Sequence, residues 1–376
     1  MQIGIVCFPV IGGSGVVATE LARALACKGH VVHLISSDPP LRYTPCLPYL
    51  YFHQVAPPDY PLFQYKPYES ALAGRLFRLA EEGMELVHVH YAIPHAVSAY
   101  LAQKALEECG IYLPVITTLH GTDTKLVKEY IDLHAISKMA LQSSTVVTAV
   151  SLALARETEI EFSLSAPPVV IPNFVDTHTF SPKRRDESLR VAYASPEEFL
   201  LVHASNFRPI KQTPQIIYLF AELLETGLPV RLLMIGDGAE RPICERLAQS
   251  LGVENKVCFT GGVAELSSLL AIGDVFVLTS AYESFGLAAL EAMACGVPVV
   301  APAVGGLPEV IRPEGGRLFS PGDLRSAREA ILKVIQSLPA YKQGARQVAL
   351  TYDTHKIVPL YESLYAEAKA KVSTNK

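Results

Sequence analysis

Residues 275–301 read VFVLTSAYESFGLAALEAMACGVPVVA, and this stretch decides the fold of the second half of the chain. It opens with an apolar run at residues 275–278 and closes with another at 297–301. Between the two runs a helical pattern begins near Phe285, with a glycine at its entrance and another, Gly296, at its exit. Short β-branched runs on both sides of a helix predict two parallel strands joined by a helical crossover.

The same stretch carries two carboxylates, Glu283 and Glu291, on either side of the expected helix start. Glu291 stands among apolar residues, where a carboxylate needs hydrogen-bond donors such as the hydroxyl groups of a ribose. The amide groups near Gly286 and Leu287, at the start of the helix, favour phosphate oxygens. The arrangement indicates a nucleotide-sugar site, with one acid for each of two hydroxylated rings. The alternative is a solvated helical glutamate, which fits the apolar neighbours of Glu291 less well.

Two series of short apolar runs divide the chain into halves of similar pattern. The first series lies at residues 3–8, 31–36, 86–90, 115–119, 145–150 and 169–171, and the second at 200–204, 231–235, 257–260, 275–278, 297–301 and 317–319. Because helical patterns separate these runs, each series predicts a doubly wound parallel sheet with right-handed crossovers.

The expected fold class is α/β, with two Rossmann-like domains at residues 1–172 and 173–355 and a cleft between them at the carboxyl ends of their strands. A proline-containing, charged segment near 175–198 is expected to be the linker. Residues 40–68 are rich in proline and tyrosine and predict an irregular segment. Apolar residues at helical spacing within 356–376 predict a terminal amphipathic helix.

Composition excludes several classes of protein. A net charge of −5 without a basic stripe argues against nucleic acid as a partner. No apolar run reaches the roughly 20 residues of a membrane span, so no stable membrane insertion is expected. The seven cysteines are scattered and never form a Cys-x-x-Cys pair, which is typical of reduced thiols. These features, with no basic leader before the first strand, predict a cytoplasmic protein and leave a homo-oligomer open.

Polar residues follow several strands of the first domain. Gly13, Ser14 and Gly15 lie between the first strand and a helical pattern, a position where free amide groups bind anions. The spacing also matches a dinucleotide fingerprint, and this alternative, an NAD-dependent dehydrogenase, does not account for the second domain. Further candidates at strand ends are Tyr91, Thr118 and His120.

The second domain supplies cations at an equivalent turn. Arg208 and Lys211 follow a strand, as suits a pyrophosphate whose departing charge needs stabilisation, and Gly236 ends the next strand. No Asp-x-Asp pair, the usual carboxylate motif for holding Mg²⁺ against a diphosphate, occurs in the chain. We therefore expect neither a metal nor another cofactor, with cations and helix amides in the place of the metal.

These motifs resemble those of the retaining glycosyltransferases of family 4, which have the GT-B fold, and the resemblance covers nearly the whole chain. Its most specific elements are Glu283-x7-Glu291 and the Gly305-Gly-Leu-Pro-Glu309 string. The resemblance implies that the first domain binds the acceptor, that the second binds the nucleotide-sugar, and that the terminal helix crosses back to the first domain. Asn206 stands where many members carry an arginine, a feature that malate-transferring members share.

The resemblance also implies a role for each site residue. His120, Arg208, Lys211 and Glu283 would act at the reacting sugar and its leaving phosphate. The implied donor-binding residues are Gly13, Gly15, Asn206, Gly236, Gly286, Leu287 and Glu291, and the acceptor-binding residues are Ser14, Tyr91, Thr118 and, as one candidate cation, Arg241.

The implied substrates are UDP-N-acetylglucosamine and L-malate, whose joining begins bacillithiol biosynthesis. No carboxylate is placed for a double displacement, so same-face substitution with retained configuration is expected. Two alternatives stay open: a family-4 transferase that uses another UDP- or GDP-sugar and a lipid or saccharide acceptor, and a nucleotide-sugar-binding module without activity.

Overall fold

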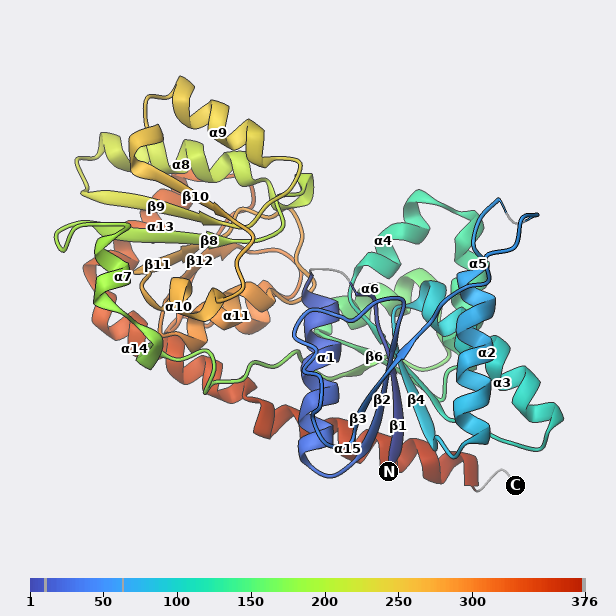
Figure 1. Cartoon of the computed structure of the whole chain (residues 1–376). Coiled ribbons are helices and arrows are strands. Elements are labelled where there is room, and N and C mark those ends of the chain that lie inside the picture. The colour runs from blue at the N-terminus through green and yellow to red at the C-terminus, as the bar shows by residue number, and fades with distance from the viewer. Residues whose placement is uncertain (10–11, 63, 374–376) are drawn as a thin grey trace. The chain divides into compact units, whose positions relative to one another are not determined.

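The computed structural model describes residues 1–9, 12–62 and 64–373. The chain divides into two compact units (Figure 1). The first contains residues 1–172 and the C-terminal residues from 355 onward, and the second contains residues 173–354. Val10 and Ile11 of the expected glycine loop, and Phe63 of the expected irregular segment, lie outside the described residues.

The first unit is a parallel sheet covered by helices. Its strands are β1 Gln2–Val6, β2 Val31–Ser36, β3 Leu50–Gln54, β4 Leu86–His90, β5 Val115–Leu119, β6 Val146–Ala149 and β7 Val169–Val170. Its helices are α1 Gly13–Cys27, α2 Tyr68–Glu81, α3 Val97–Glu108, α4 Thr122–Glu129, α5 Asp132–Ser143, α6 Leu152–Phe162 and most of α15 Thr354–Ser373.

The strand order of this sheet among the described residues is β3-β2-β1-β4-β5-β6-β7, and every pair is parallel. This is the doubly wound order, in which successive strands are added on one side of β1 up to β3 and then on its other side from β4 onward. At such a switch point the two neighbouring crossovers leave on opposite faces of the sheet, so a crevice opens at the carboxyl ends of the strands. The predicted residues that follow β1 and β4 therefore lie at the position where such folds bind ligands.

The segment 40–68 was expected to be irregular, and this expectation was wrong in part. It contains β3, which pairs with β2 along its whole length. As the edge strand of the sheet, β3 leaves Tyr51 about half exposed, so its sequence lacks the continuous apolar run of the central strands. Burial on one face explains why an apolar-run criterion missed it.

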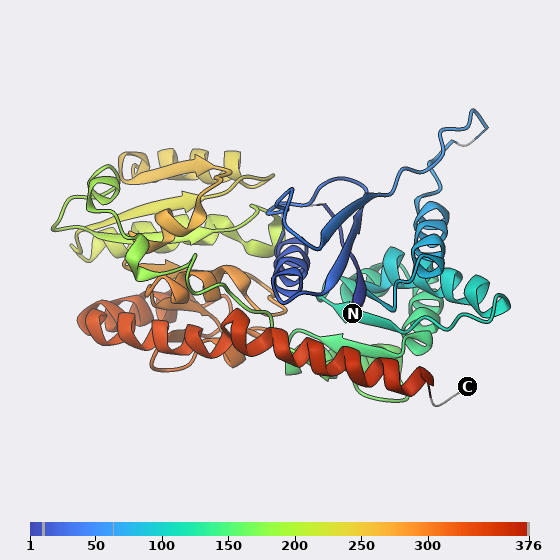
Figure 2. The same ribbon diagram turned by 60° about the horizontal axis from the view of Figure 1, so that its bottom comes forward.

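Helix α15 completes the first unit from the far end of the chain (Figure 2). Its Tyr361 and Tyr365 side chains are fully buried. The hydroxyl group of Tyr365 is 2.7 Å from Nδ1 of His88 in β4. Lys28, which follows α1, forms a 2.6 Å ion pair with Glu362. The helix is thus held to the first unit both by buried aromatic side chains and by charge.

The second unit repeats the architecture. Its strands are β8 Phe199–Ala204, β9 Val230–Ile235, β10 Val257–Gly261, β11 Val275–Val277, β12 Val299–Pro302 and β13 Gly316–Phe319. Its helices are α7 Glu187–Val191, α8 Thr213–Glu225, α9 Arg241–Ser250, α10 Leu266–Ala271, α11 Leu287–Ala294, α12 Leu307–Val310, α13 Leu324–Gln336 and α14 Leu338–Ala349.

The sheet order in the second unit is β10-β9-β8-β11-β12-β13, again parallel throughout the described strands. The switch point falls between β8 and β11, so the doubly wound order occurs twice in the chain. The predicted strands are confirmed as elements, with ends that shift by one or two residues. The helix expected near Phe285 begins at Leu287.

The segment near 175–198 is part of the second unit and not the linker that its prolines and charges suggested. Phe180 is buried there, and so is the guanidinium of Arg190, which lies 2.8 Å from Asp274. Arg346 of α14 donates hydrogen bonds to the carbonyl oxygens of Thr177 and Phe180. A charged segment resembles a linker in sequence, but here one of its charged residues, Arg190, is buried and paired with Asp274 of the second unit.

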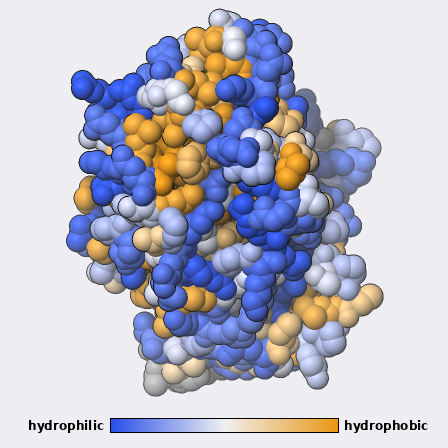
Figure 3. Space-filling model, turned by 90° about the vertical axis from the view of Figure 1, so that its left-hand side faces the viewer, coloured by the Kyte–Doolittle hydropathy of each residue, from blue (hydrophilic) through white to orange (hydrophobic). Residues whose placement is uncertain are grey.

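Apolar side chains fill both units, whereas the face shown in Figure 3 is largely hydrophilic, with apolar patches between the polar residues. Within the described ranges, no helix combines the length and apolar character needed to cross a membrane.

Candidate functional site at the two switch points

The turn after β8 is bonded directly to the residues that follow β11. The backbone N–H of Ala281 donates to the carbonyl oxygen of Ile210 at 2.8 Å. The hydroxyl group of Thr279 donates to the carbonyl oxygens of Lys211 and Gln212. These bonds join residues about 70 positions apart in sequence into one surface at the switch point of the second sheet.

Lys211 and Glu283, both predicted site residues, meet on this surface. Their Nζ and Oε1 atoms are 2.6 Å apart, and the two side chains are only 17% and 12% exposed. The hydroxyl group of Ser280 donates to the same Oε1 atom at 2.8 Å. The other oxygen, Oε2, accepts no hydrogen bond from the described residues and is available to a hydroxyl group of a ligand.

Arg208 stands beside this pair on the same turn. It is exposed, and its guanidinium forms no hydrogen bond or ion pair within the described ranges. Its backbone N–H donates to the carbonyl oxygen of half-buried Asn206, which makes the turn tight. The turn therefore presents one cation to solvent, Arg208, and holds a second, Lys211, beside a carboxylate. Two cations on one turn suit a diphosphate.

Gly236, after β9, is fixed in place by close approach to the turn. A Cβ atom there would lie 1.9 Å from the carbonyl oxygen of Ser205, and the φ angle of Gly236 is +120°. Only glycine allows both the conformation and the contact. Arg241, the first residue of α9, has its charge matched by Asp237 and Glu245, at 3.2 and 2.8 Å. This pairing favours a structural role for Arg241 over binding of an acceptor.

Helix α11 places the second glutamate inside the fold. Gly286 precedes the helix with a φ angle of +94°, and a Cβ atom there would lie 2.5 Å from Leu307. The first amide groups of the helix, beginning at Leu287, have no side-chain cap and remain donors for an anion. Glu291 is 4% exposed, one turn further into the helix. A buried carboxylate at this depth needs polar partners, which a ligand hydroxyl can add.

In the first unit, Ser14 and Tyr91 meet across the switch point. Ser14 lies in the first turn of α1 after β1, Tyr91 follows β4, and the hydroxyl group of Tyr91 donates to Oγ of Ser14 at 2.6 Å. Gly13 and Gly15 flank Ser14 in the same turn, which carries no acidic residue. The N–H groups of this turn have no partner within the helix, so the position suits an anion.

His120 lies close to these residues after β5. Its Nε2 atom is 2.8 Å from Nδ1 of His90, and its ring packs against that of Tyr91 with centroids 5.2 Å apart. Burial lowers the pKa of His120 to about 3 and that of neighbouring His95 to about 4, so both are neutral at physiological pH. A neutral imidazole can donate or accept a hydrogen bond but carries no charge to the ligand.

Asp123 joins the two loops that hold Tyr91 and His120. Its carboxylate accepts hydrogen bonds from the backbone N–H groups of Ala92, at 2.7 Å, and of His120, at 3.2 Å. Burial raises the pKa of Asp123 to about 6, although the backbone hydrogen bonds act in the opposite direction. The residue fixes the geometry of both strand ends.

Thr118, predicted to bind the acceptor, is instead fully buried. Its hydroxyl group lies 2.6 Å from Nε2 of His88 and 2.5 Å from the hydroxyl group of Thr148. The side chain is therefore occupied within the sheet, which favours a structural role. His88, in the middle of β4, is likewise fully buried, and burial lowers its pKa to about 3.

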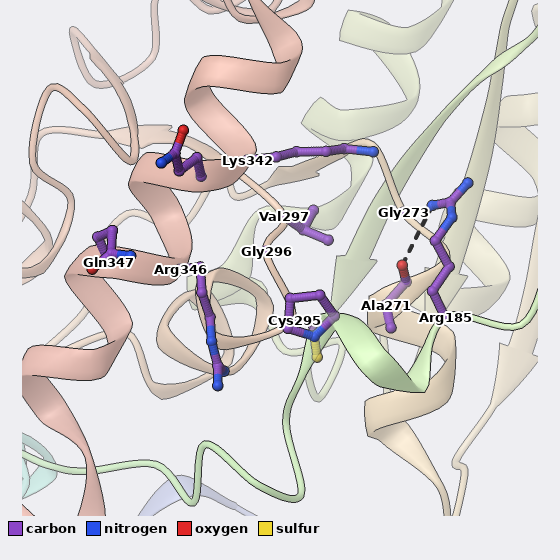
Figure 4. Close-up of a pocket in the computed structure, with 11 residues that line it drawn as sticks. Arg185, Ala271, Gly273, Cys295, Gly296, Val297, Lys342, Arg346 and Gln347 are labelled. Atoms are coloured by element: carbon purple, nitrogen blue, oxygen red, sulfur yellow. Dashed lines mark hydrogen bonds between the residues drawn. The ribbon is translucent and has the colours of Figure 1, made fainter.

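A cavity of about 320 Å³ in the second unit lies away from these residues (Figure 4). It is lined by Gly273 and Gly296, which precede β11 and β12, so it opens at the amino ends of the strands. Arg346 beside it donates to the carbonyl oxygen of Ala294, and Lys342 pairs with Asp274. The cations around this cavity are used by the fold itself.

Sequence reasoning did not single out two residues that orient the site, Ser280 and Asp123. Ser280 stands three residues before Glu283, and Asp123 stands three residues after His120. A polar residue three positions from a predicted site residue, close to a strand end, is the signal that could have identified them. Among the described residues, no group of three or more His, Cys, Asp or Glu side chains is arranged to hold a metal ion.

Comparison with known proteins identifies the class of protein to which the chain belongs. The model "Glycosyltransferase Family 4" matches residues 11–179, and "Glycosyl transferases group 1" matches residues 185–347. The N-acetyl-alpha-D-glucosaminyl L-malate synthase of Bacillus anthracis is 38% identical over 372 residues, which cover 97% of this chain and 96% of that protein.

Two solved structures share the fold. A sucrose-phosphate synthase from Thermosynechococcus elongatus has a TM-score of 0.81 at 21% identity, covering 98% of this chain and 99% of the other. Anabaena HepE in complex with UDP and glucose has a TM-score of 0.78 at 21% identity, covering 100% and 99%. Two doubly wound units with these matches define a glycosyltransferase of the GT-B fold. The chain belongs to glycosyltransferase family 4.

Proposed function

We propose that this glycosyltransferase moves N-acetylglucosamine from UDP-N-acetylglucosamine to the hydroxyl group of L-malate, the first step of bacillithiol biosynthesis. The observation that carries the proposal is the 38% identity, over nearly the full length of both chains, to the malate synthase of Bacillus anthracis. A fold-level likeness alone does not select a substrate, because one fold hosts many transferases.

The second unit is the proposed donor-binding domain. Glu291 binds the ribose hydroxyls, the amide groups from Gly286 and Leu287 bind phosphate, and Oε2 of Glu283 accepts from a sugar hydroxyl. Arg208 and Lys211 bind the diphosphate, with Asn206 and Gly236 shaping the turn. The proposal is supported by the convergence of the Lys211–Glu283 pair, exposed Arg208 and the uncapped helix on one switch point.

The first unit is the proposed acceptor-binding domain. Malate is a dianion, so the amide groups of the first turn of α1, beside Ser14, suit one of its carboxylates. Gly13 and Gly15 of the same turn keep their proposed place at the diphosphate of the donor. The Ser14 and Tyr91 hydroxyl groups add hydrogen bonds at the same point. His120 stands beside them as a neutral group that contacts the sugar.

The proposed chemistry is same-face substitution without a metal. The bond from the anomeric carbon to the UDP oxygen breaks as the malate oxygen attacks the same face, through an oxocarbenium-like state. The departing phosphate takes the malate hydroxyl proton. Arg208 and Lys211 stabilise the negative charge that develops on this phosphate. Such electrostatic stabilisation of the transition state is usually the largest single contribution to catalysis. Configuration at the anomeric carbon is retained.

A donor-by-acceptor screen tests the function. Purified protein is incubated with UDP-N-acetylglucosamine or UDP-glucose and with L-malate, or succinate as a control without the attacking hydroxyl group. We expect UDP release with L-malate, none above background with succinate, no loss in EDTA, and an α-linked product by NMR. Release with a saccharide or lipid acceptor but not with malate would support the alternative family-4 activity. A glycosyl adduct on Glu283 by mass spectrometry would overturn the same-face mechanism.

A further inference from the structure

His90 is the last residue of β4 and is fully buried. Its Nδ1 atom lies 2.8 Å from Nε2 of His120, and the two rings are inclined by only 20°. His120 itself is mostly buried after β5, beside Tyr91. The two imidazoles therefore share one hydrogen bond at the edge of the predicted site.

Both rings are neutral at physiological pH. Burial lowers the pKa of His120 to about 3 and holds the pKa of His90 well below its usual range. A hydrogen bond between two neutral imidazoles contains one proton, carried either by Nδ1 of His90 or by Nε2 of His120. The two arrangements give His120 opposite properties at its other nitrogen.

The remaining nitrogens distinguish the two arrangements. Nε2 of His90 is buried with no hydrogen-bond partner among the described residues. If His90 accepted the shared proton, its own proton would be on this Nε2 atom, and an N–H donor would be buried unpaired. Buried N–H groups without a partner are rarer than under-satisfied acceptors. The proton is therefore better placed on Nδ1 of His90.

We propose that His90 is a positioning residue that donates from Nδ1 to Nε2 of His120 and so fixes His120 as the Nδ1–H tautomer. This inference rests on the proposed transferase function for its consequence. Nδ1 of His120 forms no hydrogen bond within the described ranges. His120 thus offers an N–H donor to an oxygen atom of the sugar substrate, where the other tautomer would offer only an acceptor.

The position of the proton is measured directly by long-range ¹H–¹⁵N NMR on the full chain labelled with ¹⁵N-histidine. The His120 signals are assigned by their loss in His120→Gln. We expect the wild-type His120 to carry its proton on Nδ1. His90→Asn keeps an N–H donor at the atom next to Cγ and should keep this tautomer, whereas His90→Leu removes the donor and should shift His120 toward the Nε2–H form.

Turnover gives the second readout, from UDP release with UDP-N-acetylglucosamine and L-malate. We expect kcat to fall about tenfold in His90→Leu, equivalent to one lost hydrogen bond, and to recover to within about threefold of wild type in His90→Asn. Both variants are also compared by thermal unfolding, because loss of stability alone would not change the His120 tautomer.

A wild-type His120 that carries its proton on Nε2, or an unchanged tautomer in His90→Leu, would overturn the inference. If His90→Leu does not fold, the wild-type and His90→Asn spectra still decide where the proton lies. If the wild type shows no turnover with any donor and acceptor, the proposed function fails, and the spectra still decide the hydrogen bond independently.

Discussion

Disrupting the ion pair between Lys211 and Glu283 tests both the stability of the candidate site and its proposed role in catalysis. Two unit charges 2.6 Å apart attract by roughly 6 kcal/mol at an effective dielectric constant of about 20. Loss of hydration in this mostly buried pair offsets much of that attraction, so we expect a net coupling of about 1–3 kcal/mol. The perturbations are Lys211→Met, Glu283→Gln and the double variant, which remove one charge, the other, or both.

Stability is measured by urea unfolding, and activity by release of UDP. Each single substitution should lower the free energy of unfolding, and the double variant should lower it by less than the sum. Lys211→Met leaves the Glu283 carboxylate with Ser280 as its described partner, so it should be the more harmful single change. If Lys211 stabilises the leaving phosphate, Lys211→Met should also lower kcat/KM by about 10²–10³.

The matched control is Lys333→Met, the same substitution at an exposed lysine on α13 of the same unit. It should change neither stability nor turnover appreciably. Additivity of the two single changes to within about 0.5 kcal/mol would refute the reasoning about the pair. A kcat/KM for Lys211→Met equal to that of the control would refute the role of Lys211 at the leaving phosphate.

Two further predictions concern stability. Because burial lowers the pKa of His88 and of His120 to about 3, unfolding takes up protons below pH 6.5. The free energy of unfolding should therefore fall by about 2 kcal/mol for each of the two histidines between pH 6.5 and pH 5. Asp123 partly offsets this loss, because its pKa is raised in the folded state. Equal urea midpoints at pH 7 and pH 5 would contradict this prediction. Gly236→Ala should cost more than about 2 kcal/mol and lower turnover, because its Cβ would lie 1.9 Å from a backbone oxygen. Gly227→Ala, with a φ angle of +80° but no atom within 4 Å, should cost only about 1 kcal/mol in the same assay.

The central strands of both sheets were predictable because burial on two faces requires continuous apolar runs, which are visible in sequence. The edge strand β3 was not, since its exposed face interrupts the run with residues such as Tyr51. The prediction of a linker near 175–198 was wrong for a different reason. Its charges suggested solvent, but Arg190 is buried against Asp274, 84 residues later. Pairing over such a distance leaves no local trace.

The candidate site shows the same division. Residue types at strand ends, such as Lys211 and Glu283, could be predicted because parallel sheets bring their carboxyl ends to one edge. The sequence does not show which of these side chains point out of the fold toward a ligand. Thr118 is the last residue but one of β5, and Tyr91 directly follows β4. The hydroxyl group of Thr118 is nevertheless bonded to His88 within the fold, while that of Tyr91 is bonded to Ser14. His88, the partner of Thr118, is bonded in turn to Tyr365 of α15, which follows more than 200 residues later in the chain and is not visible in the local sequence.

Helix α15 also has a consequence for how the molecule is made. During synthesis His88 leaves the ribosome 277 residues before Tyr365, its buried partner. The second unit is in effect an insertion within the first, and the first unit reaches its final packing only after the second has been translated. A chain interrupted between β7 and Tyr361 has every described strand of the first sheet but lacks the two tyrosine side chains that are buried in the first unit. Completion of the first unit therefore depends on a segment that is translated after the second unit.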